Sequence, residues 1–163
     1  ANRLPGVQRF ADVGAQLASC RAGVAWEAAG LATGAYEKAL AYCNERIQFG
    51  KRITSFQMIQ DQLVRMLGKV TALQTFVMQL GEVEARDGHI SAERASLAKV
   101  WCCDTMREVV SIARGMMGGN GILLEHDVAR LFADAEAVYA YEGSREKNAL
   151  IVGRAITGQS AFV

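Results

Sequence analysis

Glu142 is the residue whose type and position point most directly to chemistry. It follows the apolar segment 137–141 and comes just before residues 144–157, which we expect to form the last helix. A carboxylate in this position can act as a general base. An apolar surround would raise its pKa, whereas a nearby helix N-terminus would favour the anion. Acidic residues are also favoured near helix starts by the helix dipole alone, so a purely structural role stays open.

Two further segments have residue types that suit a phosphate-bearing cofactor. Gly118-Gly119-Asn120-Gly121 provides backbone that can approach a ligand closely and adopt positive φ. Arg46-Ile47-Gln48-Phe49-Gly50 places a guanidinium beside a planar amide and an aromatic ring. Each has a simpler interpretation: glycines often end a helix, and cations are favoured at helix C-termini.

Arg21 lies among small apolar residues of the first expected helix, and a buried arginine needs an anionic or carbonyl partner. The sequence suggests either a ligand or an internal acid such as Asp104 as this partner. Cys20, Cys43, Cys102 and Cys103 all lie in expected helices, which favours reduced thiols over a disulfide framework. His89 and His126 are far apart, so we expect no metal site.

These residues must be positioned by helices. A helical pattern runs from about residue 12 to 46, with Gly50 as a candidate C-cap in the loop 49–54 and Ser55 as a candidate N-cap of the next helix. The apolar positions expected on one side of the first helix are Val13, Leu17, Cys20, Val24, Leu31 and Ala35. From Phe56 a second helix has a seam at steps of three and four: Phe56, Ile59, Leu63, Met66, Val70, Leu73, Val77 and Leu80.

The remaining helices are marked by caps and turns. Ser91 is expected to cap a third helix, whose buried side comprises Leu97, Val100, Trp101, Val109, Ile112 and Met116. A short helix at 127–133, an apolar link at 137–141 and a last helix at 144–157 follow. This order predicts an all-α fold in one domain over residues 1–163, an up-down helical bundle of three long helices plus a shorter fourth and fifth.

Composition supports this fold and excludes several classes of function. The 163 residues are 51% apolar, with one proline and only 7% aromatic residues, which favours helix over an all-β fold. Eighteen basic and 17 acidic residues give a net charge of +1, too balanced for a nucleic-acid or membrane surface based on charge. No stretch is long and apolar enough to span a bilayer, and the first residues are not those of a signal peptide. We therefore expect a soluble intracellular domain.

Four motifs occur together in the order and context of one family: residues 46–50, Phe56-Gln57, Met117-Gly118-Gly119-Asn120-Gly121 and Tyr141-Glu142-Gly143. Over about residues 4–162 the chain resembles the C-terminal helical domain of the acyl-CoA dehydrogenase family. The segments Leu4-Pro5-Gly6, 117–122, 153–158 and 161–162 look most like those of glutaryl-CoA dehydrogenases. Members of the family also have an N-terminal helical domain and a middle β-domain, and neither corresponds to any part of this chain.

The resemblance implies that Glu142 is the catalytic base, which takes the α-proton of an acyl-CoA thioester while hydride leaves the β-carbon for FAD. In glutaryl-CoA dehydrogenases the product then loses CO2 and gives crotonyl-CoA. The residues implied to bind FAD are Arg46, Gln48, Phe49, Gln57, Gly115, Met116, Met117, Gly118, Gly119 and Ser144. Of these, Arg46 and Gln57 would hold the FAD of a neighbouring subunit, and Ser144 would contact FAD on the catalytic side.

The same resemblance gives a substrate-binding set and a set of partners. The implied contacts to acyl-CoA, with glutaryl-CoA favoured, are Gly14, Gln16, Ser19, Arg21, Tyr141, Gly143 and Phe162. The family is typically a homotetramer that passes its electrons to an acceptor protein. The expected location is the cytoplasm in a bacterium or the mitochondrial matrix in a eukaryote.

Two alternatives to a glutaryl-CoA dehydrogenase remain. One is another short-chain acyl-CoA dehydrogenase or oxidase with the same C-terminal motifs. The other is a non-catalytic helical assembly module that has kept the bundle and lost the flavin chemistry. Met116 and Lys147 favour the second, because Met116 stands where family members often have glutamine and Lys147 where they usually have an apolar residue.

Overall fold

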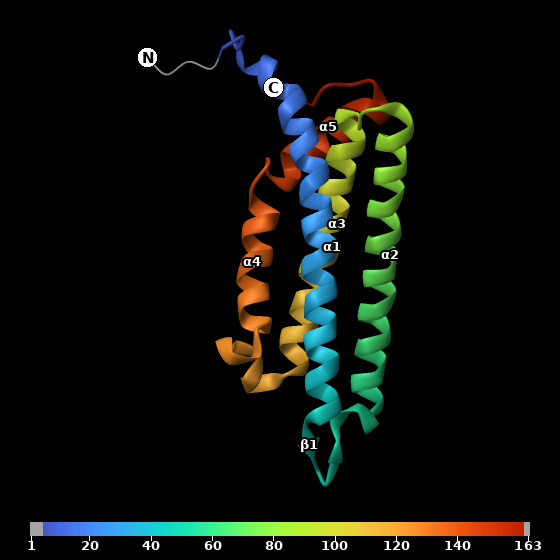
Figure 1. Ribbon diagram of the computed structural model, residues 1–163, viewed down its shortest axis with the longest axis vertical. Helices are drawn as coiled ribbons and strands as arrows, with labels where there is room; N and C mark the ends of the chain where they lie inside the picture. The colour runs from blue at the N-terminus through green and yellow to red at the C-terminus, as the bar shows by residue number, and fades with distance from the viewer. Residues whose placement is uncertain (1–4, 162–163) are drawn as a thin grey trace.

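The computed structural model describes residues 5–161, except for the side chains of residues 10, 11, 15 and 18, and it is almost entirely helical (Figure 1). Three long helices run along the molecule, α1 (Gly14–Glu45), α2 (Gln57–Asp87) and α3 (Ala92–Met116). Two shorter helices follow, α4 (Val128–Ala140) and α5 (Arg145–Thr157). The predicted all-α bundle of three long and two shorter helices is therefore confirmed.

Short elements join these helices. Four 3₁₀ turns are present in the described residues: η1 (Phe10–Val13), η2 (Ile53–Ser55), η3 (Gly118–Ile122) and η4 (Leu124–His126). Strands β1 (Ile47–Gln48) and β2 (Lys51–Arg52) form an antiparallel hairpin in which Ile47 pairs with Arg52. Phe49 and Gly50 form its turn with φ of 53° and 75°, the positive values that a tight hairpin requires. Gly50 is thus a turn residue, and Arg46 is the C-cap of α1.

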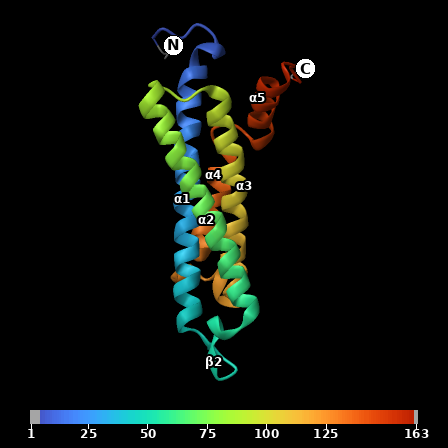
Figure 2. The same cartoon turned by 90° about the vertical axis from the view of Figure 1, so that its right-hand side faces the viewer.

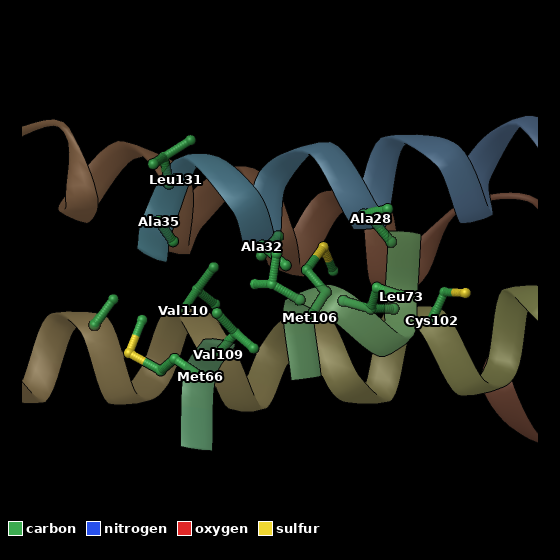
Figure 3. Close-up of a cluster of buried hydrophobic side chains, with 14 of the residues drawn as sticks. Ala28, Ala32, Ala35, Met66, Leu73, Cys102, Met106, Val109, Val110 and Leu131 are labelled. Carbon is green, nitrogen blue, oxygen red and sulfur yellow. The ribbon is translucent and has the colours of Figure 1, made fainter. Parts of the chain in front are cut away.

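Helix α1 is buried along a stripe of alanines. Ala25, Ala28, Ala32, Ala35 and Ala39 are all fully buried, and their alternating spacing of three and four places them on one face. Figure 3 shows three of them facing residues of α3. Small side chains allow neighbouring helix axes to approach closely. The predicted buried side of this helix is only partly correct: Val24 and Ala35 are buried, whereas Leu31 is only partly buried against the core.

Helices α2 and α3 complete the core. The seam of α2 is confirmed, with Met66, Val70, Leu73, Val77 and Leu80 buried. Its N-cap is Phe56 rather than Ser55, because Ser55 ends η2. Ser91 caps α3 as predicted and accepts a hydrogen bond from the Arg94 amide at 3.5 Å.

The predicted buried side of α3 is only partly correct. Val109 and Met116 are buried, whereas Leu97 and Trp101 are 45% and 37% exposed. The buried face consists mainly of smaller or sulfur-containing residues, among them Ala98, Cys102 and Met106. The large apolar residues at 97 and 101 therefore lie beside the core stripe, where the Trp101 ring packs on Phe76 at a centroid distance of 5.2 Å.

Helix α4 is longer than expected. Residues 137–140, predicted as part of an apolar link, are its last turn, and Val138 is buried. The Cys103 thiol donates to the Val138 carbonyl at 3.9 Å, so this last turn contacts α3. Ser144 caps α5 through the Lys147 amide, and Figure 2 shows α5 beside α3 and displaced from the main bundle. None of the helices in residues 5–161 combines the length and apolar character needed to cross a membrane.

Candidate active site

Glu142 lies in the short connection between α4 and α5, near the end of the bundle opposite the hairpin (Figure 1). Its φ is 56°, an uncommon left-handed value for a residue with a side chain. The side-chain oxygen Oε2 is buried and has no hydrogen-bond partner among the residues that the structure describes. A buried carboxylate oxygen left unsatisfied by the protein is costly to maintain. It is also free to accept a proton from a ligand placed beside it.

Arg21, a residue of α1, holds the connection between α4 and α5 in place. Its guanidinium Nε donates to the Glu142 backbone carbonyl at 3.3 Å, and the side chain is only 6% exposed. The expected partner Asp104 instead forms an ion pair with Arg145 at 2.8 Å. Of the two candidates named from the sequence, Asp104 is therefore wrong. The structure supplies a carbonyl as the partner of Arg21.

Two buried side chains that the sequence did not single out hold the same connection. Lys99 Nζ donates to the carbonyls of Tyr139 at 2.5 Å and Gly143 at 3.0 Å. Asn148 Nδ2 lies 3.5, 3.0 and 3.1 Å from the carbonyl oxygens of Glu142, Gly143 and Ser144. Both side chains are fully buried. A signal for Lys99 was present, since it lies on the buried stripe of α3 between Ala95 and Cys102.

Tyr141 precedes Glu142 and is anchored by a residue of α1. Its hydroxyl donates to the carboxylate of Glu27. Partial burial, followed by this contact with Glu27, raises the pKa of Tyr141. The hydroxyl therefore remains a donor to Glu27 further into the alkaline range than an ordinary tyrosine would. Glu27 is a further residue of this region that sequence analysis missed.

Not all of the other residues predicted to bind substrate lie beside Glu142. Gly14 and Ser19 line a cavity of about 420 Å³ with the turn between α2 and α3, near the N-terminus of α1. The Gln16 amide Nε2 donates to the Cys20 thiol at 3.5 Å. Gly143 adjoins Glu142, whereas Phe162 lies outside the described residues. The structure thus brings Arg21, Tyr141 and Gly143 to Glu142, and places Gly14 and Ser19 in a separate cavity of the same end.

A second cavity, of about 380 Å³, lies at the hairpin end of the bundle. Most of the residues predicted to bind cofactor line it: Arg46, Gln48, Phe49, Met116, Met117, Gly118 and Gly119. Gln57 and Gly115 are exposed and do not line it, and Ser144 lies at the opposite end. Two residues that the sequence analysis did not assign, Tyr42 and Asn120, also line it and are joined by a hydrogen bond of 2.9 Å.

The chemistry of this cavity fits a ligand with phosphates and rings. Gly118 and Gly119 are exposed, and a Cβ on either would meet no atom of the described residues within 4 Å, so open space lies over this backbone. Arg46 provides a guanidinium that can form two hydrogen bonds to one phosphate. Phe49 is 91% exposed, so its ring is available for contact with a ligand. No group of three histidine, cysteine or acidic side chains with metal-binding geometry occurs in residues 5–161.

The two ends of the bundle are well separated. Arg21 contacts the Glu142 carbonyl, and Arg46 caps the far end of the same helix. About seven helical turns, or roughly 38 Å, lie between them. Ser144 and Arg46 of one chain therefore cannot surround the same atoms of one ligand.

The sequence itself matches a known family. The family model described as "Acyl-CoA dehydrogenase, C-terminal domain" matches residues 10–157. The chain belongs to the acyl-CoA dehydrogenase family. Within this family, the matched region is the C-terminal helical domain.

Solved structures of other acyl-CoA dehydrogenases have the same fold. A glutaryl-CoA dehydrogenase from Mycobacterium smegmatis is 34% identical with a TM-score of 0.91, over 99% of this chain and 41% of its own. A glutaryl-CoA dehydrogenase from the same organism in complex with FADH2 is 28% identical with a TM-score of 0.92. The match covers 98% of this chain and 41% of that one. Butyryl-CoA dehydrogenase from Megasphaera elsdenii is 31% identical with a TM-score of 0.83. The match covers 90% of this chain and 38% of that one. The chain spans about two fifths of the length of these structures.

Proposed function

We propose that this chain is the C-terminal domain of an FAD-dependent acyl-CoA dehydrogenase and that Glu142 is its catalytic base. The observation that supports this role is the buried Oε2 of Glu142, which has no partner in the described protein. It lies in a connection that Arg21, Lys99 and Asn148 hold by their hydrogen bonds.

In this proposal the chain removes a proton from the substrate. Glu142 Oε2 accepts the α-proton of the acyl thioester, and the carboxylate becomes a carboxylic acid. Thioester α-protons are weakly acidic, so the site must also exclude water and polarise the thioester carbonyl. FAD, when bound, supplies the hydride acceptor for the β-carbon. Tyr141 and Gly143, on either side of Glu142, would bound the acyl group.

The cofactor would be shared between copies of the chain. The cavity lined by Arg46, Phe49, Gly118 and Gly119 fits a phosphate- and ring-bearing group, but it lies roughly 38 Å along α1 from the Glu142 end. Ser144 would contact FAD at the catalytic end, whereas Arg46 and the glycines would contact the FAD of a neighbouring subunit. This arrangement requires an oligomer, and we propose a homotetramer.

We propose glutaryl-CoA as the substrate, with loss of CO2 to give crotonyl-CoA. This proposal rests on the chain's motifs and on its 34% identity to a glutaryl-CoA dehydrogenase. A butyryl-CoA dehydrogenase at 31% identity supports the alternative of a short-chain substrate without decarboxylation. We also propose that electrons pass to an electron-transferring flavoprotein. A chain that is 30% identical to this one belongs to a structure described as the electron-transferring flavoprotein of Acidaminococcus fermentans.

The test uses the full-length protein from its own source. Native mass spectrometry should give a tetramer of longer chains, each with the mass of one FAD. Anaerobic addition of glutaryl-CoA should bleach the flavin and release CO2, whereas butyryl-CoA should release none. Bleaching by both substrates without CO2 would favour a simple short-chain dehydrogenase. A short chain without flavin would favour the non-catalytic assembly module.

A further inference from the structure

Lys99 is an unusual charged residue in the core of the bundle. It projects from α3, is fully buried, and donates from Nζ to two backbone carbonyls, those of Tyr139 and Gly143. The Tyr139 ring also lies 5.5 Å from Nζ. Among residues 5–161, no carboxylate forms an ion pair with this ammonium. Its partners are therefore dipoles rather than charges.

The two carbonyls lie on either side of Glu142. Tyr139 belongs to the last turn of α4, whose carbonyls have no partner within the helix. Gly143 follows Glu142, and these two residues have φ of 90° and 56° respectively. The consecutive left-handed residues reverse the chain between α4 and α5. The ammonium of Lys99 thus joins the beginning and the end of the segment that contains the proposed base.

This arrangement is costly for the fold. Burial lowers the pKa of Lys99, because removing an ammonium from water disfavours its charged form. The partial negative charge at the C-terminus of α4 compensates part of this cost. A well-packed apolar side chain at this position would avoid the cost altogether. Such a residue would leave the carbonyls of Tyr139 and Gly143 without this common donor.

We propose that Lys99 is a positioning residue for Glu142. By holding the carbonyls of Tyr139 and Gly143, its ammonium maintains the left-handed conformation at Glu142 and aims Oε2 at the substrate. Lys99 itself touches neither substrate nor cofactor in this proposal. The proposal rests on the proposed function of Glu142 as the base.

The experiment compares Lys99→Met with wild type in the full-length, FAD-loaded protein. Methionine keeps a similar length but has no charge and no donor. Flavin reduction by glutaryl-CoA or butyryl-CoA, whichever bleaches the wild type, is followed anaerobically in stopped flow. We expect the limiting reduction rate to fall about 100-fold, while the acyl-CoA dissociation constant changes less than about threefold. A merely structural defect would reduce FAD content and weaken substrate binding as well.

A second readout does not depend on turnover. Amide hydrogen exchange of residues 139–145 should become at least about tenfold faster in Lys99→Met, while exchange in the core of α1 and α2 stays unchanged. Lys38→Met is the matched control, because Lys38 is exposed and pairs with Asp127 far from the connection. It should change neither measurement. If Lys99→Met does not fold, Lys99→Gln, which keeps one donor without the charge, is measured in the same way.

The possible failures can be distinguished. A wild-type protein that retains FAD but is not reduced by acyl-CoA would contradict the proposed function, whatever the exchange data show. An active wild type whose Lys99→Met variant is equally fast, or exchanges equally slowly at residues 139–145, would overturn the positioning role. Faster exchange throughout the bundle, with loss of FAD, would also overturn it, because Lys99 would then be a general stabiliser of the fold.

Discussion

The guanidinium of Arg21 donates to the backbone carbonyl of Glu142 at 3.3 Å, although 121 positions of sequence separate the two residues. This contact joins α1 to the connection between α4 and α5. The side-chain oxygen Oε2 of Glu142 has no hydrogen-bond partner within the described part of the chain. The protein therefore anchors this residue by its main chain and leaves its side chain available.

Replacing Arg21 should loosen this anchor. Arg21→Met removes this donor and leaves the Glu142 carbonyl with the longer contact to Asn148 at 3.5 Å. We expect the free energy of unfolding to fall by about 1–3 kcal/mol, measured by urea denaturation of the chain. Arg65→Met, on an exposed part of α2, should change it by less than about 0.5 kcal/mol. Equal unfolding midpoints for the two variants would contradict the account.

Gly121 is required by close backbone contact. A Cβ at this position would lie 2.2 Å from the Arg114 carbonyl oxygen, whereas a Cβ at Gly119 would meet no described atom within 4 Å. We expect Gly121→Ala to destabilise the chain by about 3 kcal/mol. Gly119→Ala should change stability by less than about 1 kcal/mol. The two variants are compared by thermal unfolding of the flavin-free protein, and a similar loss in both would disprove the steric explanation.

Buried thiols should make the chain sensitive to alkali. Burial raises the pKa of Cys102 from its usual 9.0 to about 12. The folded chain therefore keeps a proton that the unfolded chain loses. Stability due to this thiol is fully present below pH 9 and is lost as pH rises from 9 toward 12, at about 1.4 kcal/mol per pH unit. Urea midpoints between pH 8 and 10 should fall less steeply for Cys102→Ala than for wild type, and parallel curves would contradict the assignment.

We expect Phe49 to contribute to FAD binding but not to the stability of the fold. Its side chain is 91% exposed, so Phe49→Ala should change the free energy of unfolding by no more than about 0.5 kcal/mol. Its ring borders the cavity proposed for FAD. We therefore expect the full-length variant to retain less FAD after purification, measured from the ratio of flavin to protein absorbance. Full FAD content would remove Phe49 from the binding site.

The fold was predictable where large apolar residues recur at helical spacing. The seam of α2 from Met66 to Leu80 is correct because large apolar residues recur there at steps of four and three without a break. On α1 the buried face consists mainly of alanines, whose small size carries little periodic signal. The end of α4 was missed because an apolar run gives no sign of helix or link. In the structure this run is the last turn of α4, and it contacts α3 through Cys103.

The site was predictable only through residues with recognisable motifs. Glu142 and Arg46 lie in such motifs, and the structure places them at opposite ends of the bundle. The roles of Lys99 and Asn148 depend on carbonyl oxygens, which every residue has, so no spacing of side chains identifies them. A lysine within the buried stripe of α3 was the available signal.

The most direct test of the central claim is flavin reduction in the Glu142→Gln variant of the full-length protein. Glutamine has nearly the same shape but cannot accept the α-proton. With FAD bound at the wild-type level, anaerobic acyl-CoA should leave the variant's flavin absorbance unchanged over a period in which the wild type is fully bleached. Bleaching of the variant at the wild-type rate would show that Glu142 is not the base.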